Sequence, residues 1–245
     1  MSKHDSMHKA AEWFKTPLGE ALSYAERERL ATTIPQLYSP VAIQVERING
    51  LKTLELTEAA TQVVIGGRSG WINDSAPDVI SDTCALPFGE RSADLVVLPH
   101  TLEFCEDSHQ LLREVAAIIV PNGHLVVIGF NPMSLWGLWR GVYRWSGRAP
   151  WCGDFIRLSR VQDWLALLGF EVASGSLLYY RPPFFRARLQ ERLRFVELSG
   201  ARWWPALAAV YIVLARKREL GISSVRQAHT KRKRLTPQLA RITHR

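Results

Sequence analysis

Two strand-length runs in which almost every residue is apolar, ADLVVLP (93–99) and HLVVIGF (124–130), constrain the fold most. Continuous apolar runs of this length are typical of strands buried on both faces of a sheet. Between them, apolar residues recur at helical spacing over 111–118, and Asp107 with Gln110 forms an expected capping box. A strand, a helix and a strand in this order predict a βαβ unit with a right-handed crossover in a parallel sheet.

Further strands are expected on both sides of this unit. Candidate strands precede it at VAIQV (41–45), TQVVIGG (61–67) and DVISD (78–82), and a closing antiparallel pair follows at 170–180 and 207–215. Ser159 and Gln162 are expected to cap a helix between the unit and this pair. The chain therefore divides into a helical cap (1–40, with its helix over 12–34), an α/β domain (41–215) with an aromatic insert (131–158), and a tail (216–245).

The net charge of +8 is concentrated in that tail. Residues 216–245 hold ten Lys or Arg and one Glu, which leaves 31 − 10 = 21 basic and 23 − 1 = 22 acidic side chains elsewhere. The tail is expected to be disordered, and it serves either nucleic-acid contact through counterion release or only solubility. No apolar run reaches the roughly 20 residues of a membrane span, and three scattered cysteines favour a reducing, cytoplasmic location without a zinc site.

The glycines of VVIGGRSG (63–70) suggest a nucleotide-binding loop, but the spacing argues against it. Only 12 positions separate Gly70 from Asp82, too few for a helix, a strand and another helix. The preferred alternative makes 41–45 the first strand, Glu46 to Gly50 the loop after it, and 61–66 the second strand. In that register VVIGG ends the second strand.

The segment 81–130 resembles the core of class I S-adenosylmethionine-dependent methyltransferases of the type-11 family. The pieces that carry the resemblance are Asp82-Thr83, LPF (86–88), DLVVLPHTLEF (94–104), LLREV (111–115) and PNG (121–123). With WFKTPLG (13–19), GFNPMSLWGL (129–138) and SRVQDWLALLGFEV (159–172), the whole chain is similar to the bacterial YafS-like branch of that family. The resemblance implies a Rossmann-like α/β fold with a mostly parallel sheet, an antiparallel C-terminal strand and a shortened N-terminal half.

The resemblance also implies S-adenosylmethionine as the cofactor. Asp82 is expected to accept a hydrogen bond from the adenine amino group, Thr83 to offer its backbone N–H, and Leu86 to cover the ring. The family's glycine-rich loop and ribose-binding carboxylate are reduced here to Gly50 and Gly66, with Glu46 as a partial substitute for the carboxylate. The remaining candidates lie at the end of the 93–99 strand, where Leu98 and Pro99 face the methionine part and His100 is a candidate general base.

The resemblance leaves the methyl acceptor open, whether a small molecule or a macromolecule. The alternative function is a degenerate methyltransferase-like protein that binds nucleic acid or an acidic partner through the basic tail. Residues 133–151, rich in Trp and Arg, are interpreted as a lid over the substrate or as a helix that packs on the sheet or rests on a membrane. Glu103 and Glu106 are expected to be solvated charges at a helix entry.

Overall fold

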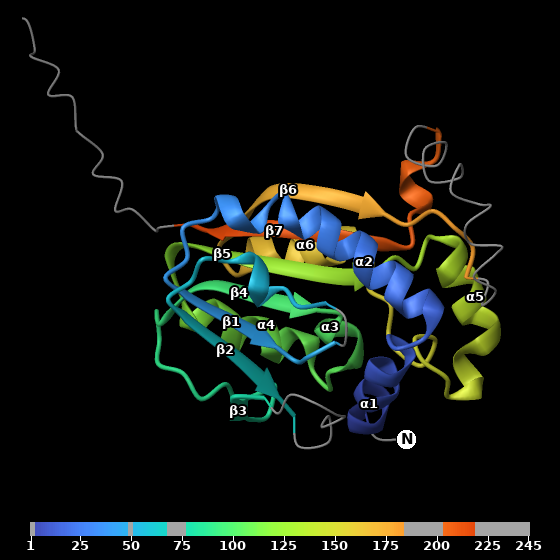
Figure 1. The fold of residues 1–245 in the computed structure, drawn as a ribbon, viewed down its shortest axis with the longest axis horizontal. Coiled ribbons are helices and arrows are strands. Elements are labelled where there is room, and N and C mark those ends of the chain that lie inside the picture. Colours follow the sequence, from blue (N-terminus) through green and yellow to red (C-terminus); the bar gives the residue numbers. More distant parts are fainter. Residues whose placement is uncertain (1–2, 49–50, 68–76, 184–202, 219–245) are drawn as a thin grey trace, which may run out of the picture.

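The computed structural model describes residues 3–48, 51–67, 77–183 and 203–218, and they form a seven-stranded sheet in the order β3-β2-β1-β4-β5-β7-β6 (Figure 1). The pairs that join β3 through β5 are parallel, whereas β7 runs antiparallel to both β5 and β6. The predicted fold class is thereby confirmed. The strands are β1 (Val41–Val45), β2 (Thr61–Gly66), β3 (Val79–Ile80), β4 (Ala93–Pro99), β5 (Ile119–Phe130), β6 (Phe170–Leu178) and β7 (Val210–Lys217).

Helices cover both faces of the sheet. α2 crosses one face, and α4 and α6 lie on the other (Figure 1), each layer burying its own apolar cluster against the strands. The helices are α1 (Lys3–Trp13), α2 (Pro17–Ala31), α3 (Thr101–Phe104), α4 (Ser108–Ile118), α5 (Leu135–Tyr143) and α6 (Leu158–Leu167). Short 3-10 turns are η1 (Ile34–Gln36), η2 (Leu54–Leu56), η3 (Arg144–Ser146) and η4 (Pro205–Leu207).

The β4-α4-β5 unit matches the expected βαβ motif. The side chain of Asp107 caps α4 by accepting hydrogen bonds from the backbone N–H groups of His109 and Gln110, both at 2.9 Å. The Gln110 side chain does not return the capping bond, because it donates to Glu114 instead. The second capping box was wrong: α6 begins at Leu158, ahead of Ser159, with no side-chain cap at its N-terminus.

The N-terminal region contains two helices instead of the single one expected over 12–34. Thr16 interrupts it: its hydroxyl donates to the Trp13 carbonyl (2.7 Å) and accepts from the Gly19 N–H (3.2 Å), while Pro17 opens α2. A Thr N-cap followed by Pro at the first helical position is a strong start signal, since Pro has no N–H to leave unpaired there.

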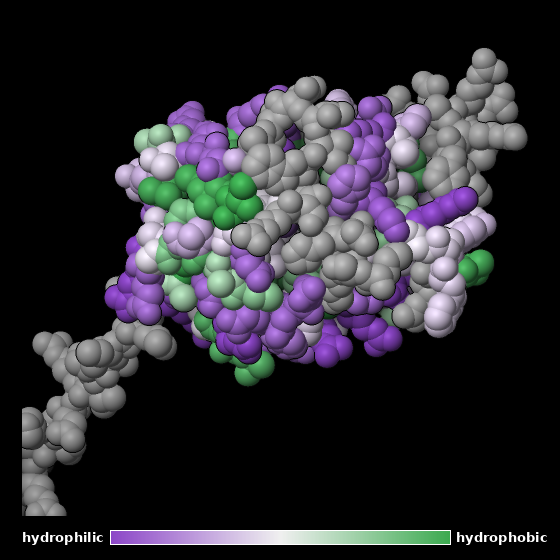
Figure 2. Space-filling view, turned by 90° about the horizontal axis from the view of Figure 1, so that it is seen from below, coloured by the Kyte–Doolittle hydropathy of each residue, from purple (hydrophilic) through white to green (hydrophobic). Residues whose placement is uncertain are grey.

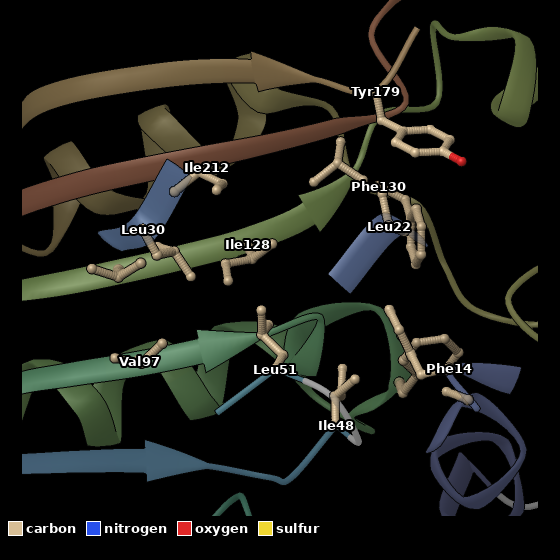
Figure 3. Close-up of a cluster of buried hydrophobic side chains, with 14 of the residues drawn as sticks. Phe14, Leu22, Leu30, Ile48, Leu51, Val97, Ile128, Phe130, Tyr179 and Ile212 are labelled. Atoms are coloured by element: carbon tan, nitrogen blue, oxygen red, sulfur yellow. The ribbon is translucent and has the colours of Figure 1, made fainter. Parts of the chain in front are cut away.

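The face that α2 buries includes one charged residue. Leu18, Leu22, Glu26 and Leu30 recur every four residues and are all buried, so a carboxylate lies in the middle of an apolar stripe. Figure 3 shows Leu22 and Leu30 directed toward the sheet, near Ile128. The predicted division at residue 40 stays a prediction, although α2 and the strands share one buried cluster.

The first half of the sheet is compressed, as expected. η2 is the only helical turn in the described part of the β1–β2 connection, and β3 has two residues. α2 precedes the sheet in sequence and shields the face over β4, β5 and β7, where its leucines meet Val97, Ile128 and Ile212.

Candidate functional site

The carboxyl ends of β1 and β4 define the region where a ligand is expected. These neighbouring strands lie where the strand order reverses, and open α/β sheets bind ligands in the crevice outside this switch point. The Thr101 hydroxyl, just beyond β4, donates to the Val45 carbonyl at the end of β1 (2.9 Å) and fixes the two ends together. The candidate site is built around this junction.

The segment after β1 is held by Gln44, which sequence reasoning missed. Its side-chain N–H donates to the Glu46 carbonyl (3.0 Å), and its side-chain oxygen accepts from the Thr53 hydroxyl. Glu46 has a positive φ of 67°, a conformation that favours glycine, and Ile48 is buried two residues on. The resembling family places glycines in this loop. Gly50, the remaining glycine candidate, lies outside the described residues.

The Glu46 side chain reaches from the end of β1 to the end of β2. Its Oε1 accepts a hydrogen bond from the Gly67 backbone N–H at 3.0 Å. A Cβ at Gly67 would lie 3.0 Å from the same oxygen, so glycine leaves room for the carboxylate. Gly66 approaches Pro77 so closely that a Cβ would lie 2.9 Å from the proline ring. The two glycines of VVIGG therefore serve close packing and the seating of Glu46.

The end of β3 carries the candidate adenine residues. Asp82 is exposed, and its Oδ1 accepts from the Cys84 N–H (2.9 Å) in a tight turn, as Asp often does. Thr83 is half-buried in this turn, and Leu86 is buried in the cluster beneath it. The turn therefore exposes the Asp82 carboxylate next to the Thr83 backbone, with the apolar side chain of Leu86 beneath them.

A fully buried ionisable cluster lies where β4 ends. His100 Nε2 is 2.9 Å from Glu26 Oε1 of α2, and its Nδ1 is 3.7 Å from Glu103 Oε1 of α3. Glu103 Oε1 also accepts from the Phe130 N–H at 2.6 Å. None of the three side chains is exposed, so the expected solvation of Glu103 was wrong. The carboxylate is buried because β5 offers it a backbone N–H.

The cluster holds a proton on His100. Burial alone would lower the pKa of His100, but the charges of Glu26 and Glu103 and the hydrogen bond with Glu26 outweigh burial and raise this pKa to about 9. His100 is therefore charged at neutral pH. A general base must be unprotonated and within reach of its substrate, and this conformation offers neither. The base role of His100 stays a prediction, for an arrangement in which α2 has moved.

The cluster is also incompletely paired. Two carboxyl groups share the single imidazole of His100. Glu26 Oε2, Glu103 Oε2 and the Tyr211 hydroxyl have no hydrogen-bond partner among the described residues, although all are buried. Buried polar atoms without partners cost free energy and mark places where a ligand or water binds. The region beyond β4 thus has unmet capacity for a cationic group.

Aromatic and apolar side chains from outside the sheet cover this end. Phe14, just after α1, lies with its ring centroid 5.3 Å from that of His100, and the Phe130 ring centroid lies 4.2 Å from that of His100. Figure 3 shows Phe14, Ile48 and Leu51 just beyond the ends of β1 and β4. The N-terminal helices therefore cover the switch point, which the sequence did not reveal.

The structure brings most of the candidate residues to one edge of the sheet. Glu46, Gly66 and His100 end adjacent strands, whereas Leu98 and Pro99 are fully buried and support the strand end from within. Asp82, Thr83 and Leu86 lie beyond β3, two strands away from β1. The residues that sequence reasoning missed here are Phe14, Glu26 and Gln44. Phe14 lies within WFKTPLG (13–19), where it was given no role at the site, and the other two belong to no motif.

A sheet in this order, with its site at the carboxyl ends of β1 and β4, defines the class I methyltransferase fold. Comparison with known proteins agrees: residues 58–127 match the family described as "Methyltransferase domain". The resemblance to type-11 methyltransferases is thereby confirmed.

Individual relatives extend this result over most of the chain. The uncharacterized protein YafS of Escherichia coli (strain K12) is 28% identical over 211 residues, which are 86% of this chain and 82% of YafS. The likeness to the YafS-like branch is confirmed in this way.

Solved structures share the fold at low identity. An S-adenosylmethionine-dependent methyltransferase of Thermotoga maritima, described as a possible histamine N-methyltransferase, superposes with a TM-score of 0.59 and 15% identity, covering 80% of this chain and 89% of that one. A geranyl diphosphate C-methyltransferase from Streptomyces coelicolor A3(2), solved with S-adenosyl-L-homocysteine, has a TM-score of 0.53 and 13% identity, with 80% of each chain covered. Identities this low establish the shared fold alone.

Proposed function

We propose that the protein transfers the methyl group of S-adenosylmethionine to an acceptor, with Glu46 in place of the family's ribose-binding carboxylate. One observation carries the proposal: the Glu46 carboxylate lies against the backbone of Gly67, directly after β2. The resembling family holds the ribose hydroxyls with an acidic residue at that strand end. Here the carboxylate reaches the same place from β1, where a glycine at position 67 leaves room for it.

The residues that follow β3 and β4 fit the same cofactor. Asp82 keeps Oδ2 for the adenine amino group while Oδ1 holds the turn, and Leu86 supplies apolar cover. Glu26 and Glu103 each have a buried oxygen without a hydrogen-bond partner among the described residues, and such oxygens suit a sulfonium and an ammonium group, which are both cationic. The cofactor would supply an electrophilic methyl group, and the chain's residues would orient it, exclude water and leave the acceptor in line. A base is optional for such a transfer.

Entry of the cofactor requires a rearrangement, because Phe14 and the Glu26–His100 pair fill the region beyond β4 in this conformation. α1 and α2 would have to move away from the sheet. This displacement would expose His100 and the unpaired oxygens of Glu26 and Glu103 together.

Calorimetry with S-adenosylhomocysteine tests the proposal. Loss of hydrogen bonds to a charged group costs about 1.5–3 kcal/mol, so Glu46→Ala should weaken binding roughly ten- to a hundredfold. Asp82→Ala should also weaken it. Glu58→Ala, an exposed residue ahead of β2, is the matched control and should bind like the wild type. Absence of binding by the wild type at millimolar ligand would refute the proposal.

The remaining expectations of location and partner are part of this proposal. We place the reaction in the cytoplasm on the basis of the three cysteines, which are scattered along the sequence. Within the described residues, no helix is long and apolar enough to span a bilayer. The acceptor is undetermined. The alternative of a degenerate binding protein has no support from the comparisons, and most of the basic tail on which it depends (219–245) lies outside the described residues.

A further inference from the structure

The aromatic insert carries a helix whose apolar stripe faces outward. In α5, Leu135, Leu138, Trp139 and Val142 follow the i, i+3, i+4, i+7 spacing of an amphipathic helix, yet Leu138 is 69% exposed and Val142 73% exposed. The helix is fastened from its other side by Trp136, which is buried. An amphipathic helix in a globular protein normally turns this stripe toward the core, so its outward direction calls for a partner.

The buried side of α5 is firmly attached to the domain. The Trp136 ring packs against Phe130, Trp151 and Tyr179, and its indole N–H donates to the Arg181 carbonyl at 2.9 Å. The exposed stripe is therefore a stable feature of the fold and is held in one orientation.

A second exposed aromatic segment lies beside the start of α5. The side-chain N–H groups of Asn131 donate to the carbonyls of Ala206 and Ala208 at 2.8 and 2.9 Å, which joins the α5 entry to the 203–208 segment. Both segments lie at the same end of the molecule (Figure 1). In Figure 2, pale atoms and one small hydrophobic group appear at this end, whereas the largest hydrophobic patch of that view lies toward the opposite end. The exposed side chains, here called the aromatic surface, are Met133, Leu135, Leu138, Trp139, Val142, Tyr143, Trp145, Trp203, Trp204 and Leu207.

The aromatic insert (131–158) differs in net charge from the rest of residues 1–215. Residues 131–158 hold four Arg and one Asp, a net charge of +3. The remainder of residues 1–215 holds 21 − 4 = 17 basic and 22 − 1 = 21 acidic side chains, a net charge of −4. The α5 sequence itself contains no acidic residue. A cationic, Trp- and Tyr-rich surface on an otherwise acidic body complements an anionic lipid interface.

We propose that the aromatic surface docks the protein on anionic phospholipid bilayers, with α5 lying in the plane of the interface. Leu138, Val142 and Trp145 would enter the headgroup–acyl boundary, while the exposed Arg148 meets lipid phosphates. The proposal does not depend on methyl transfer, because it uses no residue of the candidate site.

Vesicle sedimentation tests this docking with the full chain. Wild-type protein should bind phosphatidylcholine vesicles that contain phosphatidylglycerol and bind pure phosphatidylcholine vesicles more weakly. Leu138→Asp/Val142→Asp should lower the partition coefficient at least about tenfold, since two apolar contacts are replaced by repelled charges. Trp145→Ala, which changes no charge, should lower it several-fold.

The matched control is Tyr38→Asp/Leu167→Asp. These residues are 86% and 85% exposed and lie outside the aromatic surface, so the double variant makes the same change in charge. It should bind vesicles like the wild type, and the basic tail is common to every variant. Equal losses in the two double variants would overturn the proposal. A second result would also overturn the proposal: the wild type forms a dimer, and Leu138→Asp/Val142→Asp abolishes the dimer but leaves vesicle binding unchanged. That result would assign the surface to contact with a second copy of the chain.

Discussion

At the scale of single residues, the Glu26–His100 pair should make stability depend on pH. The pKa of His100 is raised from 6.5 to about 9, so its contribution is complete below pH 6.5 and is lost as pH rises toward 9. Glu26→Gln should destabilise the fold by about 3–5 kcal/mol at pH 6, because it leaves a buried charge without its partner. Chemical denaturation from pH 6 to 9 measures both effects.

The control for this variant is Glu28→Gln, an exposed carboxylate on the same helix. It should leave stability and its pH dependence close to those of the wild type. A wild-type profile with the same slope as that of Glu26→Gln between pH 6.5 and 9 would show that His100 does not hold its proton through this pair.

Gly129 offers a second prediction at this scale. An added Cβ would contact the Tyr211 hydroxyl and lie 2.8 Å from Glu103 Oε1, both in the buried cluster. Gly129→Ala should therefore destabilise the protein by about 1–3 kcal/mol through overpacking. Gly175→Ala in β6 is the control, since a Cβ there meets nothing within 4 Å. Urea denaturation of the two variants should separate them clearly, and equal stability would contradict the packing seen around Tyr211.

At the scale of elements, the packing of α1 against the start of α2 leaves no room for a side chain at Gly19. A Cβ on Gly19 would lie 2.5 Å from both the Phe14 Cα and the Trp13 carbonyl oxygen, and neither backbone atom can move without displacing α1. We expect Gly19→Ala to destabilise the protein by about 1–3 kcal/mol and to increase hydrogen exchange in α1.

Gly141, in α5, provides the comparison for this element. A Cβ there meets nothing within 4 Å, so Gly141→Ala should be neutral or stabilise the protein by up to about 1 kcal/mol through helix propensity. If both alanine variants behaved alike in denaturation and exchange, the close approach of α1 to α2 would not be rigid.

At the scale of the whole molecule, the covered switch point predicts how a ligand changes the protein. If S-adenosylhomocysteine binds as proposed, the amides around Gly67 should gain protection from hydrogen exchange. The amides of residues 13–18 should lose protection, because Phe14 must leave His100. Exchange measured with and without ligand tests this. Binding with unchanged exchange at 13–18 would show that the ligand enters by another route.

Much of the sheet could be predicted because buried parallel strands are apolar at most positions. This pattern identified β1, β2, β4 and β5, and residue counting placed Glu46 after the first strand instead of making VVIGGRSG the cofactor loop. The helix boundaries were less accurate. Thr16 could have been recognised as an N-cap before Pro17, but the surrounding periodicity suggested one continuous helix.

The composition of the site could be predicted only in part, because its residues come from distant segments. Glu26 looks like a surface charge in ERER (26–29), and only the tertiary structure places it beside His100, 74 positions away. Glu103, at the start of a helix, likewise looks like a surface charge in the sequence although the structure buries it. Whether a carboxylate is solvated depends on what another element offers it, and local sequence does not encode this.

The sequence by itself determined that the core of the sheet is parallel, that the chain resembles the type-11 family, and that charge is concentrated in particular segments. Apolar runs, motif order and composition can all be read along the chain without the tertiary structure. Only the tertiary structure decided that α1 and α2 cover the switch point, that Glu46 reaches Gly67, and that the stripe on α5 faces outward. Periodicity shows that a helix has an apolar face, but the direction of that face depends on which side chain, here Trp136, finds a buried site.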